Sequence, residues 1–142
     1  MQDPYCHSSS VLVERPAEIA FEIMADGIKQ GGWAWGSAER SEVEPGLFVG
    51  RSIFTGRQTF VRLHIDHARL MVDYDVGPSK EAMQFRNMSR VIPGGLLKIG
   101  DGKCVVTLLS WRLATQSDAD WAQFGCVHEA EMFMITGLLE RS

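Results

Sequence analysis

The apolar side chains of residues 117–139 recur at helical spacing. The residues that share one face follow one another at steps of three or four, which is the repeat of one side of an α-helix. They are Trp121, Phe124, His128, Met132, Ile135 and Leu139. The pattern predicts one long C-terminal helix with a histidine inside its apolar face. Such a face is buried against another layer of structure.

Between residues 37 and 113 the pattern changes to an alternation with a period of two, which is typical of strands. Short turn sequences rich in Gly, Pro and Asp separate the alternating segments. Links this short join neighbouring antiparallel strands, so the region predicts a meander. The predicted strands are residues 38–44, 47–54, 58–66, 70–76, 83–92 and 104–113.

The first part of the chain predicts a further strand and a short helix. Residues 11–13 form the apolar centre of the strand. Pro16 suits the first turn of a helix because its missing N–H is not needed there, and Asp26-Gly27 supplies a stop. A second short turn is expected at residues 28–33. Residues 1–8 are expected to be a flexible tail.

The alternation also assigns side chains to the two faces of the sheet. In residues 104–113, the favoured register directs inward Val105, Thr107, Leu109 and Trp111. The competing register directs inward Cys104, Val106 and Leu108. In the preceding three strands the expected inward set is Val61, Leu63, Ile65, Leu70, Val72, Tyr74, Val76, Met83, Phe85, Asn87, Ser89 and Val91.

Composition and charge narrow the class of protein. The 142 residues are expected to form one domain, a length at which roughly 70% of the unfolded surface becomes buried. The net charge of -4 gives no electrostatic reason to expect nucleic acid or an anionic membrane as a partner. The strand arginines occur singly and are expected on a solvated face: Arg51, Arg57, Arg62, Arg69, Arg86 and Arg90.

Cysteine spacing and the lack of long apolar runs indicate a compartment. Cys6, Cys104 and Cys126 are widely spaced and form no CxxC pair, which predicts reduced thiols in the cytoplasm. No apolar run approaches the roughly 20 residues that span a bilayer. The polar N-terminal segment lacks the apolar core of a signal peptide.

The order of these elements resembles the START-like helix-grip superfamily, also called SRPBCC. Residues 16–26, beginning Pro-Ala-Glu and ending in Asp, are similar to the first helix of that group, and Trp33 lies near its usual tryptophan. The resemblance covers residues 11–139. It implies an α+β helix-grip fold: a seven-stranded antiparallel curved sheet wrapped around a long C-terminal helix, with one or two short helices between strands 1 and 2.

The superfamily includes polyketide cyclases and dehydrases, lipid-transfer domains and pollen-allergen-like proteins. Because it uses one cavity for many tasks, the resemblance predicts a pocket without naming its occupant.

His128 is the first candidate for chemistry. An imidazole in an apolar pocket can anchor a ligand or carry a proton, and Glu131 lies three residues later on the same side of the helix. The alternative is a core histidine that only packs and hydrogen-bonds. A zinc site of the HExxH type is excluded because Met132 stands where the second histidine belongs. The catalytic candidates are His128, Glu131 and Tyr74; no metal or cofactor is expected.

The predicted ligand-binding residues combine aromatic and apolar side chains with a few polar groups, as small-molecule pockets do. They are Tyr74, Phe85, Asn87, Ser89, Thr107, Trp111, Trp121, Phe124, His128 and Met132. The alternative for each of them is ordinary core packing.

Three functions remain open. The favoured one is binding of a small hydrophobic or amphipathic ligand between the sheet and the C-terminal helix. The second is a polyketide cyclase/dehydrase-like enzyme that uses His128 for proton transfer. The third is a protein-interaction module without a ligand. Phe133, Met134 and Cys126 lie away from the inward face of the helix and predict a homodimer contact.

Overall fold

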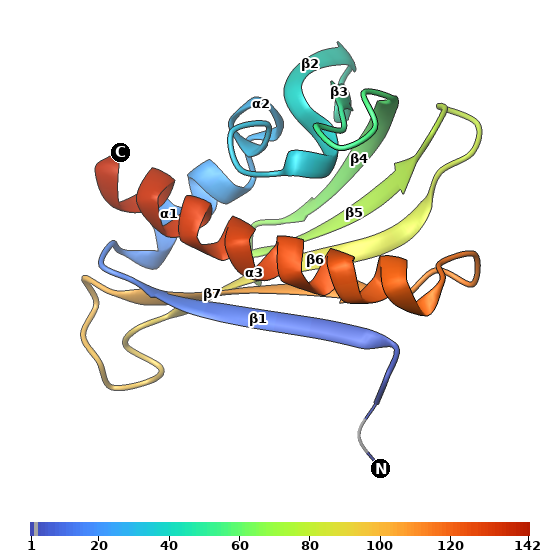
Figure 1. Cartoon of the computed structure of the whole chain (residues 1–142). Coiled ribbons are helices and arrows are strands. Elements are labelled where there is room, and N and C mark those ends of the chain that lie inside the picture. The colour runs from blue at the N-terminus through green and yellow to red at the C-terminus, as the bar shows by residue number, and fades with distance from the viewer. Residues whose placement is uncertain (2) are drawn as a thin grey trace.

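A long helix lies across a curved antiparallel sheet in the computed structural model, which describes residue 1 and residues 3–142 (Figure 1). The strands are β1 Cys6–Val13, β2 Ala38–Glu44, β3 Leu47–Arg51, β4 Gln58–Asp66, β5 Met71–Gly77, β6 Gln84–Pro93 and β7 Cys104–Trp111. The helices are α1 Ala17–Met24, α2 Gly27–Gln30, the 3-10 turn η1 Trp35–Ser37 and α3 Asp118–Arg141. The predicted α+β helix-grip architecture is confirmed.

The strand order is β1-β7-β6-β5-β4-β3-β2, so β2 to β7 form the predicted meander and β1 pairs with its last strand. This pairing begins with Cys6 opposite Trp111, so the flexible tail expected over residues 1–8 is wrong from Cys6 onward. The sequence pattern does not predict this part of the strand, because residues 6–10 are Cys, His and three Ser, which present no apolar face. Backbone pairing with β7 supplies the order that apolar patterning does not predict.

The predicted strand at residues 47–54 is too long, because β3 ends at Arg51. The Ser52 hydroxyl accepts hydrogen bonds from the backbone N–H groups of Phe54 and Thr55, at 3.2 and 3.3 Å. This local side-chain turn replaces the strand pairing.

The favoured register of β7 is wrong, and the competing one is observed. Cys104, Val106, Leu108 and Ser110 are the buried side chains of this strand. Thr107 lies on the opposite face, where its hydroxyl is 2.7 Å from that of Ser10. Apolar residues occupy both faces of this strand, so the alternation could not choose between them.

A β-bulge in β6 places Phe85 on the outer face. Tyr74 is opposite Asn87 and Asp75 is opposite Phe85, so Arg86 is the extra residue. One inserted residue shifts the alternation by one, so Phe85, which precedes Arg86, turns outward, whereas Asn87 and Ser89, which follow it, keep the predicted face. Phe85 is therefore half exposed and packs on Trp111, with ring centroids 5.3 Å apart. Both aromatic residues were expected inward, and both lie on the outer face.

The inward face of α3 is confirmed along most of its length. The helix begins after Ser117, whose hydroxyl accepts from the backbone N–H of Asp120 at 3.1 Å. Its buried residues are His128, Glu131, Met132, Ile135 and Leu139. On the outer side, Phe133 is 78% exposed and Met134 is 41% exposed.

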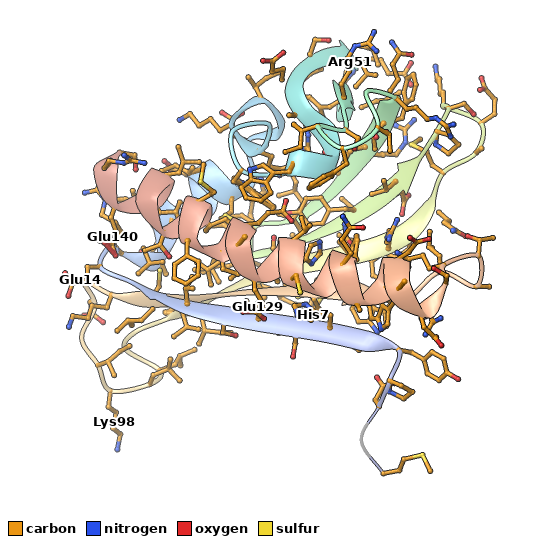
Figure 2. All side chains as sticks on the ribbon, viewed as in Figure 1. His7, Glu14, Arg51, Lys98, Glu129 and Glu140 are labelled. Atoms are coloured by element: carbon orange, nitrogen blue, oxygen red, sulfur yellow. The ribbon has the colours of Figure 1, made fainter. Side chains whose placement is uncertain are left out.

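Polar contacts join α3 to β1 along the front edge in Figure 2, where His7 lies beside Glu129 and Glu14 beside Glu140. His7 Nε2 is 3.1 Å from Glu129 Oε1, and the Ser9 hydroxyl donates to Glu129 at 3.0 Å. These contacts fix the helix relative to the first strand. Within the described residues, no helix is both long and apolar enough to cross a membrane.

Candidate functional site

A cavity of about 330 Å³ lies between the inner face of the sheet and the N-terminal half of α3. This volume is at the lower end of the range of about 300–1,000 Å³ that is typical of small-molecule pockets. The exposed residues of the lining, which mark its mouth, include Phe54, Thr55, Asp120 and Gln123. The interior walls include Trp33, Arg40, Val61, Tyr74, Val76, Arg86, Asn87, Leu108, Phe124, Val127, His128 and Glu131.

Five of the residues predicted for the site line this cavity: Tyr74, Asn87, Phe124, His128 and Glu131. Ser89 is buried behind the wall, with its hydroxyl 2.8 Å from that of Tyr74. Met132 belongs to the hydrophobic core.

The other predicted site residues lie away from the cavity. Trp121 stacks on Phe124, with ring centroids 5.6 Å apart, and its indole donates to the Pro4 carbonyl at 3.0 Å. Phe85, Thr107 and Trp111 lie on the outer face of the sheet, for the reasons of register given above.

His128 is held in an uncharged state by its surroundings. Its Nδ1 lies 2.9 Å from the Ser110 hydroxyl, and its Nε2 lies 3.6 Å from Glu131 Oε1. Its ring centroid is 4.2 Å from that of Phe124. Burial lowers the pKa of His128 to about 3, and the nearby His7 and Arg86 act in the same direction. At neutral pH this imidazole is therefore unprotonated, and its low pKa makes it a weak base.

Glu131 is a buried carboxyl group that accepts a hydrogen bond from one backbone N–H group. Its Oε2 accepts from the backbone N–H of Trp35 at 3.0 Å. Burial raises its pKa to about 7, which the Trp35 hydrogen bond and the charge of Arg40 only partly oppose. Near pH 7 the Glu131 carboxyl group is therefore about half protonated, beside an unprotonated imidazole. A carboxyl group with a pKa near 7 can both donate and accept a proton at neutral pH.

Arg40 and Tyr74 are polar residues whose own contacts satisfy them. The Arg40 guanidinium donates to Ser37 Oγ at 2.7 Å and to the side-chain oxygen of Gln30, and burial lowers its pKa to about 10. Gln30 in turn donates to the Met24 carbonyl at 2.7 Å. Burial raises the pKa of Tyr74 to about 12, so it keeps its proton. This network fixes the segment between α2 and β2.

Arg86 was expected on the solvated face, but the β-bulge directs it to the cavity. Its guanidinium carbon lies 4.3 Å from the centroid of the Phe124 ring, a cation–π contact. Burial lowers its pKa.

Three cavity residues have buried polar atoms without a hydrogen-bond partner in the described residues: Trp33 Nε1, Arg86 Nε and Asn87 Oδ1. Most buried polar atoms in proteins are paired, so these three are exceptions that a ligand could explain.

The predicted set of site residues omitted four residues that shape the site: Trp33, Arg40, Arg86 and Ser110. A bulge has no signature in the alternation, so no signal pointed to Arg86. The competing register of β7 would have found Ser110, because it is the position after Leu108 on that face. Within the described part of the chain, no cluster of three or more His, Cys, Asp or Glu side chains could hold a metal ion.

Comparison with known proteins shows that the chain is similar in fold to several solved structures. No protein-family model matches the chain. No curated protein sequence matches it either. Among solved structures, a START superfamily protein from Mycobacterium smegmatis is similar with a TM-score of 0.72 and 13% identity, over 96% of this chain and 98% of the other.

Two further structures have the same arrangement. The Zhui aromatase/cyclase from a Streptomyces species gives a TM-score of 0.69 and 15% identity, over 96% of this chain and 93% of the other. The Aha1 dimer from Colwellia psychrerythraea gives a TM-score of 0.68 and 10% identity, over 95% of this chain and 96% of the other. Sequence identities this low indicate a common fold and do not indicate a common activity. The chain therefore has the START-like helix-grip fold that its sequence resembles.

Proposed function

We propose that the protein binds a small amphipathic molecule in the cavity under α3. The observation that carries this proposal is the set of three buried polar atoms, on Trp33, Arg86 and Asn87, that have no hydrogen-bond partner within the described residues. They lie in the wall of a cavity that is otherwise rich in apolar side chains. A wall of this kind matches a ligand with an apolar body and a few polar groups. A cavity of this size argues against an interaction module whose interior is only a core.

Filling the cavity is expected to abolish binding. Val76 lines it, and Val76→Trp would place an indole in the space that the ligand needs. We expect the affinity for the neutral fluorescent probe N-phenyl-1-naphthylamine, measured by titration, to fall about tenfold or more. Val43→Trp is the matched control, because Val43 is half exposed and lies outside the cavity. Equal binding by the two variants would contradict the proposal.

A second candidate function is a dehydration of the cyclase type, favoured by a Glu131 carboxyl group whose pKa of about 7 suits proton transfer at neutral pH. The Glu131 carboxylate would accept a proton from the carbon next to a ketone. The same group, now protonated, would donate to the hydroxyl on the adjacent carbon, so that water leaves and a C=C bond forms. The Zhui aromatase/cyclase has the same fold and 15% identity.

This second function is tested with 4-hydroxy-4-phenylbutan-2-one, whose dehydration product absorbs in the near ultraviolet. Proton transfer by Glu131 would make Glu131→Gln slower by roughly 10²–10⁴-fold. If the wild-type protein binds the compound and does not accelerate its dehydration, the enzymatic function is refuted and only the binding function stands.

We also propose that the outer face of α3 contacts a second copy of the chain. Phe133 and Met134 expose large apolar surface there, and a structure of the same fold is a dimer. Light scattering after size exclusion should give a dimer for the wild type and a monomer for Phe133→Glu. A monomeric wild type would refute the contact.

A further inference from the structure

The charges around the cavity are unbalanced. Two guanidinium groups, those of Arg40 and Arg86, line it. The buried carboxyl group is that of Glu131, and burial raises its pKa to about 7, so it is largely protonated at pH 6 and below. Asp120 also lines the cavity, but it is exposed at the mouth, where water screens its charge. The interior therefore has an excess of positive charge.

Arg86 is the residue that carries this excess. Within the described residues, no carboxylate lies within 4.0 Å of its guanidinium nitrogens. Its Nε is buried and has no hydrogen-bond acceptor there. Its observed contact is the face of the Phe124 ring, at 4.3 Å. A partly desolvated charge without a partner is costly, so an anion that the described part of the chain does not supply would stabilise the half-buried Arg86 guanidinium.

Arg40 provides the contrast within the same cavity. Its Nε and Nη groups donate to Ser37, Gln30 and the Gly27 carbonyl, at distances of up to 3.5 Å. These uncharged acceptors take up the N–H groups of the Arg40 guanidinium and hold the side chain in place. Arg86 has no such set of contacts, and the bulge that turns it inward is a local departure from regular pairing. Bulges of this kind often aim a side chain at a functional site.

We infer that the molecule bound in this cavity carries a carboxylate, which lies on the Arg86 guanidinium with the apolar body of the molecule against Phe124, Val76 and Leu108. This inference rests on the proposed binding function and specifies its ligand. A carboxylate has one negative charge and two acceptor oxygens, which match the single unpaired guanidinium and its planar fork. A phosphate group carries more charge than the one unpaired guanidinium offsets.

The test uses two probes that differ in charge at the same atom. 2-Naphthoate and 2-naphthamide have the same rings, and only the first is an anion at pH 6, where Glu131 is largely protonated. Isothermal titration of the full chain should give an affinity about tenfold or more higher for naphthoate, as one charge-assisted pair predicts. Arg86→Gln should weaken naphthoate by about the same factor and leave naphthamide unchanged.

Arg90→Gln is the matched control, because Arg90 lies on the same strand and is exposed to solvent. It should keep the preference for naphthoate. Arg86→Lys keeps the charge without the fork, and it should keep a reduced preference; it replaces Arg86→Gln if that variant fails to show a cooperative thermal transition.

The possible outcomes distinguish a failure of the carboxylate inference from a failure of the proposed binding function. Equal affinities of the wild type for naphthoate and naphthamide, or a preference that survives in Arg86→Gln, would overturn the carboxylate inference alone. If neither compound nor N-phenyl-1-naphthylamine binds, the proposed binding function fails and the inference falls with it.

Discussion

Glu131→Gln is expected to raise the free energy of unfolding at pH 8 by about 3 kcal/mol, because it removes a carboxyl group that is costly to ionise where it is buried. Burial raises the pKa of Glu131 from an ordinary 4.5 to about 7. Below about pH 4.5 the group is protonated in the folded and unfolded chains, so it has no effect on stability there. As the pH rises towards 7 the unfolded chain ionises first, and stability is lost. Glutamine carries no such dependence and can still accept the hydrogen bond from Trp35.

Urea unfolding of both proteins at pH 4.5 and pH 8 measures this effect. The difference between them should be close to zero at the lower pH and largest at the higher one. Glu140→Gln is the control, because Glu140 is an exposed carboxyl group of the same helix, and it should change stability by less than about 0.5 kcal/mol. A Glu131→Gln protein no more stable than the wild type at pH 8 would show that this carboxyl group is not desolvated.

Ile135→Ala is expected to cost about 2–5 kcal/mol of stability, since it leaves a space in the layer between α3 and the sheet. Ile135 is fully buried in the hydrophobic core. Ile53→Ala removes the same atoms from a side chain that is 59% exposed, and it should cost less than about 1 kcal/mol. Equal losses for the two variants would mean that α3 does not bury the face described above. Urea midpoints at pH 7 provide the comparison.

Two costly features occur together in the cavity and point to function. Arg86 is a partly desolvated charge without an anionic partner among the described residues, and Glu131 is an acid whose pKa burial raises to about 7. Neither favours folding, and perturbed groups of this kind cluster at functional sites. The stability predicted for Glu131→Gln is therefore also a statement about the site: the chain would be more stable with a glutamine there.

Periodicity predicted the elements whose faces differ in polarity. The face of α3 from His128 to Leu139 and the strands β4 and β5 were predicted in the observed orientation, because apolar and polar side chains alternate there. β7 was assigned to the wrong register, since Val105 and Leu109 on one face are as apolar as Val106 and Leu108 on the other.

The part of the site that sequence reasoning missed depends on contacts between distant residues. Arg86 faces the cavity only because one residue is inserted in β6 relative to β5. Arg40 is buried only because Gln30 and Ser37 accept its hydrogen bonds. Neither condition has a periodic signature in the sequence. His128, Glu131 and Tyr74 were found because they lie on elements with a clear apolar face.

The most direct test of the binding cavity is an NMR titration of the tryptophan indole N–H resonances with 2-naphthoate. Trp33 Nε1 is an unpartnered donor in the cavity wall, whereas Trp111 packs on Phe85 on the outer face of the sheet. Single Trp→Phe variants assign the two signals. If the naphthalene ring enters the cavity, the Trp33 resonance shifts as the probe is added and the Trp111 resonance stays in place. A Trp33 resonance that does not move, or shifts of equal size at both residues, would contradict a ligand site between α3 and the sheet.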